Sequence, residues 1–214
     1  MRKIGIMGGT FDPIHTAHLV LGEQAYDQLG LEKVVFMPSG NPPHKRNREG
    51  RAGDADRLAM VKAAVAGNPH FEVSELEMNE EGYSYTYRTL ELLREKHLDC
   101  IFYFIIGADS LFDFDGWYKP ERIAASCILV AATRNHTPSD ELAGRVRHVE
   151  EKFGASVVVL DTENMDISSS RLREAAAQGK SIRYYVPESV RLYIEEKGLY
   201  KGSAPGGQSD GSEK

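Results

Sequence analysis

Six short runs of apolar and β-branched residues alternate along this chain with segments of helical periodicity, and this alternation constrains the fold most strongly. It predicts a doubly wound α/β fold, in which a mostly parallel sheet carries helices on both faces. The expected strands are 3–7, 33–37, 71–73, 101–106, 128–132 and 157–160. The expected helices are 14–29, 55–66, 86–96, 140–152, 170–178 and 188–196. Ligands bind beyond the carboxyl ends of the strands in such sheets, so we expect the chemistry there.

Length and composition indicate one large globular domain with a core of its own. The chain has 214 residues, of which 41% are hydrophobic and 27% are charged. We expect a single domain over residues 1–201, because no internal repeat or change of composition divides them. Residues 202–214 are polar and rich in glycine and serine, which predicts a disordered tail.

Charge, cysteines and hydropathy limit the partners and the compartment. The net charge of −6 argues against nucleic acid as a partner. Cys100 and Cys127 lie at or inside apolar strand segments, which is typical of buried thiols in a reducing compartment. No signal peptide and no apolar run of membrane-spanning length is present, so we expect a cytoplasmic protein with no membrane partner. The sequence leaves a homo-oligomer open.

The first strand runs into a glycine turn that carries the strongest functional signal of the chain. The apolar run 4–7 is followed by Gly8 and Gly9, and Asp12 and Pro13 predict the N-cap and first position of a helix. His15 and His18, three residues apart, would share one face of that helix start. Backbone N–H groups and the helix dipole favour an anion there, so we predict a phosphate site. The spacing matches neither the GxxxxGK[ST] nor the GxGxxG phosphate motif.

Other polar groups follow the expected strands, and each also has a purely structural interpretation. Serines 168–170 can simply cap a helix, but Arg171 and Arg173 would oppose its dipole unless they share an anion with it. The basic segment 44–51, Arg134 and Asp109 all lie just beyond strand ends. Trp117 lies in a polar loop, which suits stacking on a planar ring as well as packing in a core.

Two of these segments identify a family. GGTFDPIHTAH, over residues 8–18, resembles the GGTFDPIHxGH signature of the nucleotidylyltransferase superfamily. Its residues FDPIH are most similar to those of bacterial nicotinate-mononucleotide adenylyltransferases. ISSSRLR, over 167–173, resembles the second signature, ISSTxIR. The segments NPPHK (41–45), IGADSL (106–111) and SYT (84–86) resemble further parts of the family, and the likeness runs from about residue 3 to 200. Ala17 and Arg88 depart from the usual Gly and Asp.

The resemblance implies a Rossmann-like nucleotidylyltransferase fold and an enzyme that joins nicotinate mononucleotide to the AMP part of ATP. The products would be deamido-NAD and pyrophosphate. Mg²⁺ would arrive with the ATP, and no protein metal site is expected. The implied catalytic residues are His15, His18 and Arg173. The implied ATP-binding residues are Gly8, Gly9, Thr10, Phe11, His15, His18, Gly107, Asp109, Ile167, Ser168, Ser169, Ser170 and Arg173. The implied residues for nicotinate mononucleotide are His44, Lys45, Tyr85, Thr86, Trp117, Tyr118 and Arg134.

Two alternatives stay open at this point. One is a related adenylyltransferase with another phosphate acceptor, such as nicotinamide mononucleotide or phosphopantetheine. The other is a nucleotide sensor without activity. The presence of His15, His18 and Arg173 argues against a sensor, because a sensor needs affinity and no groups for a transition state.

Overall fold

A computed structural model describes residues 1–40, 50–78, 84–132, 139–162 and 165–201 of the chain. The expected tail, residues 202–214, lies outside these ranges. The strands are β1 (Arg2–Gly9), β2 (Lys33–Pro38), β3 (Phe71–Val73), β4 (Cys100–Gly107), β5 (Ile128–Ala132) and β6 (Ser156–Leu160). The helices are α1 (Thr16–Leu29), α2 (Asp54–Val65), α3 (Thr86–Lys96), α4 (Ala108–Phe112), η1 (Phe114–Gly116), α5 (Pro120–Ala124), α6 (Ser139–Phe153), α7 (Ser169–Ala177) and α8 (Glu188–Lys197).

The six predicted strands are all present and form one sheet with the order β3-β2-β1-β4-β5-β6. Every neighbouring pair is parallel, so the doubly wound α/β prediction is confirmed. The chain moves outward in one direction from β1 and in the other from β4. The carboxyl ends of these two central strands therefore form the switch point at which such sheets bind ligands.

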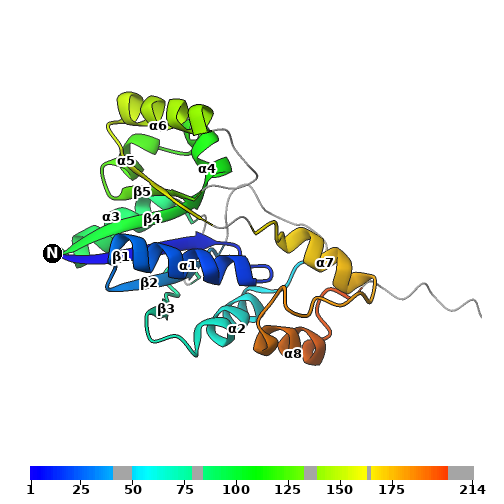
Figure 1. Cartoon of the computed structure of the whole chain (residues 1–214). Coiled ribbons are helices and arrows are strands. Elements are labelled where there is room, and N and C mark those ends of the chain that lie inside the picture. Colours follow the sequence, from blue (N-terminus) through cyan, green and yellow to red (C-terminus); the bar gives the residue numbers. More distant parts are fainter. Residues whose placement is uncertain (41–49, 79–83, 133–138, 163–164, 202–214) are drawn as a thin grey trace, which may run out of the picture.

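Alternating side chains of the strands feed two hydrophobic cores, one on each face of the sheet. On β4, Tyr103 and Ile105 join the core beneath α1, α2, α7 and α8. Phe102, Phe104 and Ile106 join the core beneath α3, α4, α5 and α6. Figure 1 shows α4, α5 and α6 on one side of the sheet and α1, α2 and α8 on the other. Both faces of the sheet are thus covered, as the nearly continuous apolar strands require.

The C-terminal helix packs back onto an early part of the chain. In Figure 1, α8 lies beside α2. The Ser189 hydroxyl donates to the Ala63 carbonyl at 2.9 Å, and the Tyr193 hydroxyl donates to the Asp56 carboxylate at 2.9 Å. Gly198, in the left-handed region with φ 62°, ends α8 and turns the chain toward Tyr200.

The start of α1 differs from the prediction. Asp12 and Pro13 do not begin the helix, and the peptide bond between them is cis. The helix begins at Thr16, with His15 in extended conformation at the N-cap. The Asp12 carboxylate is bound instead by the Tyr200 hydroxyl and the Ala52 N–H, which are partners from distant parts of the chain. Hydrogen bonds to residues distant in the chain therefore replace the N-cap bond that Asp12 was predicted to make.

The segment between β4 and β5 also differs from the expected strand end and polar loop. It contains two short helices and a 3₁₀ turn, which are α4, η1 and α5. Periodicity cannot reveal such elements because each has five residues or fewer. Here they carry Trp117 on a folded segment, where it packs against Phe104 and Phe114 at ring distances of 6.2 and 5.7 Å.

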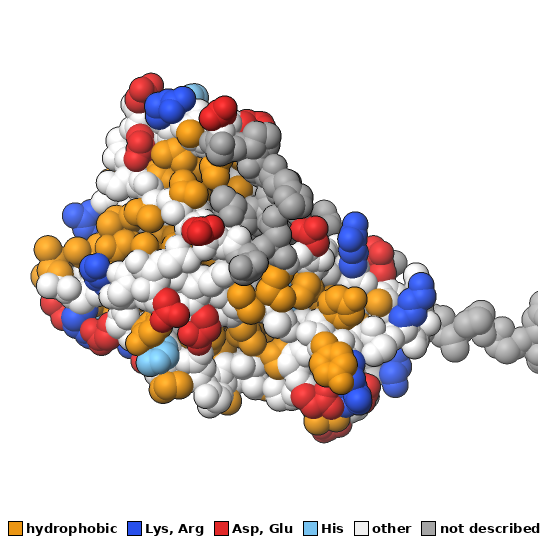
Figure 2. Space-filling model, in the orientation of Figure 1, with side chains coloured by type: hydrophobic (Ala, Val, Ile, Leu, Met, Phe, Trp, Pro, Cys, Tyr) orange, Lys and Arg blue, Asp and Glu red, His pale blue; other side chains and the backbone are white. Residues whose placement is uncertain are grey.

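The cysteines, the helix hydropathy and the surface charges agree in part with the expectations from the sequence. Cys100 and Cys127 are free thiols, and both are half-buried, whereas buried thiols were expected. Among the described residues, no helix is both long and apolar enough to cross a membrane. Acidic and basic side chains are interspersed on the face that Figure 2 shows.

Candidate active site

A cavity of about 260 Å³ opens at the carboxyl ends of β1, β2 and β4. Its floor is formed by strand residues, among them Ile6, Met37 and Phe104. The glycine turn after β1 contributes Gly8, Gly9 and Thr10. Tyr85, Thr86, Trp117 and Tyr118, which were predicted for the mononucleotide, line the same cavity. The structure thus places three residues predicted to bind ATP and four residues predicted to bind the mononucleotide around one cavity.

Aromatic rings form one wall of this cavity. The rings of Tyr85 and Tyr118 lie 4.9 Å apart, and both contact Tyr87. Trp117 is half-buried, so it belongs to the core and to the cavity wall at once. Tyr118 keeps 55% of its surface exposed. A flat ring that enters here would contact the other rings edge-on or stacked. Such ring pairs stabilise binding by more than the burial of their apolar surface alone.

Helix α3 directs its N-terminus into the same cavity. Thr86 is the first residue of α3, after Tyr85 at the N-cap. The first turn closes on the Tyr85 carbonyl, which accepts from the Arg88 and Thr89 N–H groups. The N–H groups of residues 86 and 87 precede any intrahelical acceptor, so helix geometry leaves them to a ligand or to solvent. A carboxylate is the natural guest of such a position.

A buried arginine holds the loops on the other wall. Arg57 of α2 is only 3% exposed, and its guanidinium donates to the carbonyls of Thr10 at 2.7 Å and Gly40 at 3.3 Å. It also pairs with Asp54 at 2.6 Å. Gly40 must be glycine, because a Cβ there would lie 2.3 Å from the Glu77 carbonyl oxygen. These contacts define the positions of the turns that follow β1 and β2.

The two predicted histidines lie together at the start of α1. Their rings stack with centroids 3.7 Å apart, and the His15 N–H donates to His18 Nδ1 at 3.2 Å. The edge of Phe11 packs on His18 at 5.1 Å. His15 is 2% exposed, whereas His18 is half-buried. His18 is therefore the histidine with surface left for a ligand.

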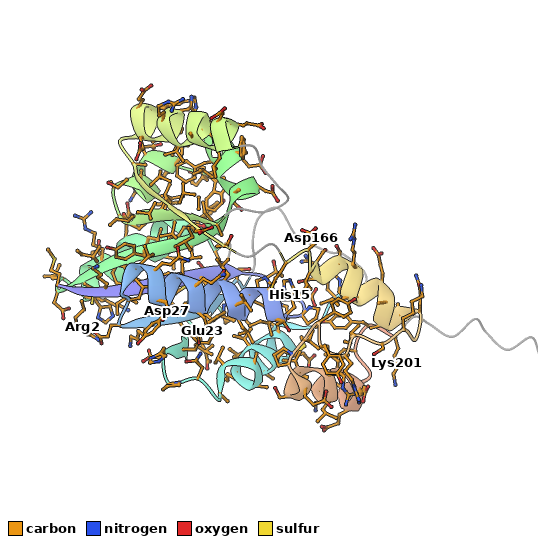
Figure 3. The ribbon with its side chains drawn as sticks, in the orientation of Figure 1. Arg2, His15, Glu23, Asp27, Asp166 and Lys201 are labelled. Atoms are coloured by element: carbon orange, nitrogen blue, oxygen red, sulfur yellow. The ribbon has the colours of Figure 1, made fainter. Side chains whose placement is uncertain are left out.

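The start of α7 is docked on this same turn. Arg173 Nη1 donates to the Asp12 carbonyl at 2.6 Å, and the Ser169 hydroxyl donates to the Pro13 carbonyl at 2.9 Å. The Ser168 and Ser170 hydroxyls lie 2.7 Å apart, and Ile167 packs on the adjoining core. Figure 3 labels His15 at the start of α1, close to the start of α7. Two segments predicted to bind one triphosphate are thus brought into contact.

Asp12 connects this cluster to Tyr200, which follows the last helix. Its Oδ1 accepts from the Tyr200 hydroxyl at 2.7 Å and from the Ala52 N–H at 3.1 Å. Its Oδ2 lies 3.7 Å from Arg173 Nη1 and 3.7 Å from Arg51 Nε. Burial and the neighbouring carboxylate raise the pKa of the Tyr200 hydroxyl, so Tyr200 acts as a hydrogen-bond donor at neutral pH.

The remaining predicted residues divide into two sets. Gly107 ends β4 at the switch point, and Asp109 is exposed in the first turn of α4. His44, Lys45 and Arg134 lie outside the described residues. Within the described part of the chain, no three histidine, cysteine or carboxylate side chains gather as metal ligands.

Arg57 and Tyr200 are the residues that the sequence interpretation missed. Arg57 shares the buried face of α2 with Met60, Val61 and Val65, at the spacing i, i+3, i+4 and i+8. A lone arginine in an apolar helical stripe is a signal that could have been noticed. Tyr200 offers no comparable local signal, because its partner is 188 positions away in the chain.

Comparison with known proteins identifies the family of this chain. A family model described as cytidylyltransferase-like matches residues 6–175. The probable nicotinate-nucleotide adenylyltransferase of Lachnoclostridium phytofermentans is 44% identical over 94% of this chain and all of its own length. The probable nicotinate-nucleotide adenylyltransferase of Desulfitobacterium hafniense, strain Y51, is 42% identical over 94% of this chain and 96% of its own.

Solved structures support the fold. The nicotinic acid mononucleotide adenylyltransferase of Plasmodium falciparum complexed with NaAD superposes with a TM-score of 0.75 at 22% identity, covering 94% of this chain and 98% of that one. The same enzyme complexed with APC gives a TM-score of 0.72. At that identity the likeness shows the fold, whereas the relatives of more than 40% identity show the family. This chain belongs to the nicotinate-nucleotide adenylyltransferase family of the cytidylyltransferase-like proteins.

Proposed function

We propose that the start of α7 and the turn before α1 hold the ATP phosphates, and that the aromatic cavity holds the mononucleotide. The enzyme is a nucleotidyltransferase that joins nicotinate mononucleotide to the AMP part of ATP and forms nicotinate adenine dinucleotide. The observation that supports the placement most is the bond from Arg173 to the Asp12 carbonyl at 2.6 Å. It brings a cation and a helix start against the histidine pair.

The reaction requires charge neutralisation and positioning more than proton transfer. An oxygen of the mononucleotide phosphate attacks the α-phosphorus of ATP, and a new P–O bond forms while the bond to the β-phosphate breaks. Pyrophosphate then leaves with the electron pair. The attacking phosphate is already ionised at neutral pH, so no side-chain base is needed. In-line phosphoryl chemistry of this kind depends on fixed cations and hydrogen-bond donors around the transferred group.

His18 and Arg173 have different roles in this scheme. His18, half-exposed beside Phe11, meets the charge that builds up between the α- and β-phosphates. Stacking on the buried His15 and the backbone bond to Nδ1 orient its ring. Arg173 and the N–H groups of the first turn of α7 hold the leaving pyrophosphate. A guanidinium has five N–H donors, so its bond to Asp12 leaves others for phosphate oxygens.

Mg²⁺ enters as a companion of ATP in this proposal. Bound to phosphate oxygens, it neutralises part of their charge. Mg²⁺ retains several waters and usually takes few protein ligands. Asp109, exposed at the switch point, is the described carboxylate that we assign to the nucleotide side of the site. His44, Lys45 and Arg134 remain proposed contacts of the mononucleotide phosphate.

The α3 N-terminus supplies the preference for the acid over the amide. Nicotinate carries a carboxylate, whose two oxygens accept from N–H donors such as those of residues 86 and 87. Nicotinamide would turn an NH₂ group toward one of these donors. An unpaired buried group costs about 1–3 kcal/mol, so two mismatches can give a preference of about 10²-fold or more. Trp117 supplies a surface for the pyridine ring.

One experiment tests both halves of the site. Pyrophosphate release is measured with nicotinate mononucleotide and with nicotinamide mononucleotide at saturating Mg-ATP. We expect kcat/KM at least about 10²-fold higher for the acid. Arg173→Ala should lose most activity, while Arg171→Ala is the matched control, exposed on the same turn of α7. Equal use of both acceptors would refute the acceptor assignment, and the opposite ranking of the arginines would refute the phosphate assignment.

A further inference from the structure

We propose that Tyr200 is a positioning residue for the transfer reaction and that it acts on Arg173 through Asp12. This inference rests on the proposed role of Arg173 at the pyrophosphate. Tyr200 follows the last helix, at the far end of the described chain from the glycine turn. It is 9% exposed, and its hydroxyl lies 2.7 Å from Asp12 Oδ1.

Asp12 holds Arg173 with two different groups. Its backbone carbonyl accepts from Arg173 Nη1 at 2.6 Å, and its carboxylate Oδ2 lies 3.7 Å from the same nitrogen. The Asp12 side chain is 2% exposed, so water solvates its carboxylate very little. A buried carboxylate depends on donors and on nearby cations to remain ionised. The direction in which Oδ2 points therefore decides where the guanidinium of Arg173 is most stable.

Tyr200 determines that direction. Oδ1 is fixed by two donors, the Tyr200 hydroxyl and the Ala52 N–H at 3.1 Å. With Oδ1 fixed, Oδ2 faces Arg173 and Arg51. Without the hydroxyl, one donor remains and the carboxylate can rotate toward its cations. The guanidinium of Arg173 would then lose its defined position, although its own contact with Asp12 could persist.

The backbone around Tyr200 is built to deliver this side chain. Gly198 ends α8 in the left-handed region, and the Leu199 N–H donates back to the Ile194 carbonyl at 3.0 Å. The chain then turns at Tyr200 itself, whose φ is 62°. The ring joins the core that also contains Phe11 and Leu172. Tyr200 is thus anchored between the two segments that meet at the proposed phosphate site.

A hydroxyl-only substitution tests the proposal, and the chain offers a matched control. Tyr200→Phe keeps the ring and removes one hydrogen bond to an aspartate. Tyr193→Phe removes a tyrosine–aspartate hydrogen bond of similar length, to Asp56 at 2.9 Å, in a less buried position between α8 and α2. We expect Tyr200→Phe to lower kcat about 10-fold, because small displacements of positioning groups cost rates of this order or more. The KM for nicotinate mononucleotide should change less than about 2-fold, and Tyr193→Phe should leave kcat unchanged.

A double-substitution cycle separates this role from a purely structural one. If Tyr200 acts through Arg173, then Tyr200→Phe should cause no further loss of kcat in an Arg173→Ala background. The inference is overturned if the two losses multiply, or if Tyr200→Phe behaves like Tyr193→Phe. Full activity of Arg173→Ala alone would instead refute the proposed role of Arg173. Circular-dichroism melting of each variant confirms that the comparison is made between folded proteins.

Discussion

Replacing Arg57 with alanine should destabilise the protein far more than the loss of its ion pair with the exposed Asp54 would suggest. Arg57 is 3% exposed and donates to the carbonyls of Thr10 and Gly40. Its partner Asp54 is 62% exposed, so that ion pair contributes little. The loss comes from two carbonyls that no longer receive a charged donor, at about 1.5–3 kcal/mol each. We expect the free energy of unfolding to fall by about 3–5 kcal/mol, below the full sum of two strong bonds, because the bond to the Gly40 carbonyl is long at 3.3 Å.

Arg191 is the matched control for this prediction. It contacts Glu188 and Glu195 on its own helix, and both carboxylates are more than half exposed, at 57% and 62%. Pairs within one helix contribute about 0.2–0.5 kcal/mol each. Arg191→Ala should therefore cost less than about 1 kcal/mol, although its ion pairs outnumber those of Arg57.

Urea unfolding followed by circular dichroism measures both variants at pH 7. A loss of about 3–5 kcal/mol should also lower the Tm by about 2–4 °C for each kcal/mol. Arg57 holds the Thr10 carbonyl, and Thr10 lines the cavity. The kcat/KM of Arg57→Ala should therefore fall as well. Equal losses for the two arginine variants, or a loss below about 1 kcal/mol for Arg57→Ala, would refute the argument from burial.

Three further predictions address catalysis, the tail and the thiols. His18→Ala should lower kcat about 10²-fold while changing ATP affinity less, and a kcat near that of the unmodified enzyme would remove His18 from the catalytic groups. Deleting residues 202–214 should leave turnover and Tm unchanged, and a Tm lower by several degrees would show that this segment docks on the protein. Burial raises the pKa of the Cys127 thiol to about 12, so its thiolate fraction at pH 8 is on the order of 10⁻⁴. Iodoacetamide should modify Cys127 only after unfolding, and mass spectrometry that finds rapid labelling of the native protein would contradict this.

Local patterns were sufficient to predict the sheet and most helices. Apolar runs such as 101–106 and 128–132 are short, rich in β-branched or aromatic residues and bounded by polar segments, and they became β4 and β5. Helix α3 has the predicted bounds, Thr86–Lys96. The strand order β3-β2-β1-β4-β5-β6 was not predicted, because alternation and right-handed crossovers allow more than one doubly wound order. The glycine turn and ISSSRLR were recognisable because they are contiguous in sequence.

Local patterns failed where a residue's partner is distant in the chain. Asp12 has the chemistry of an N-cap, but Tyr200 and Ala52 bind its carboxylate, and the helix begins at Thr16. Arg57 looks like a solvated helix residue until the turns after β1 and β2 place two carbonyls over it.

The sequence by itself determined the fold class and the family, and it singled out the segments that we propose to bind phosphate, because hydrophobic periodicity and contiguous motifs encode them. Only the tertiary structure decided that α7 docks on the turn before α1 and that Tyr200 reaches Asp12. These pairings lie 161 and 188 positions apart, and no local propensity describes them. They form because parallel strands bring their carboxyl ends to one edge, where buried polar groups must find partners among whatever segments the topology delivers there.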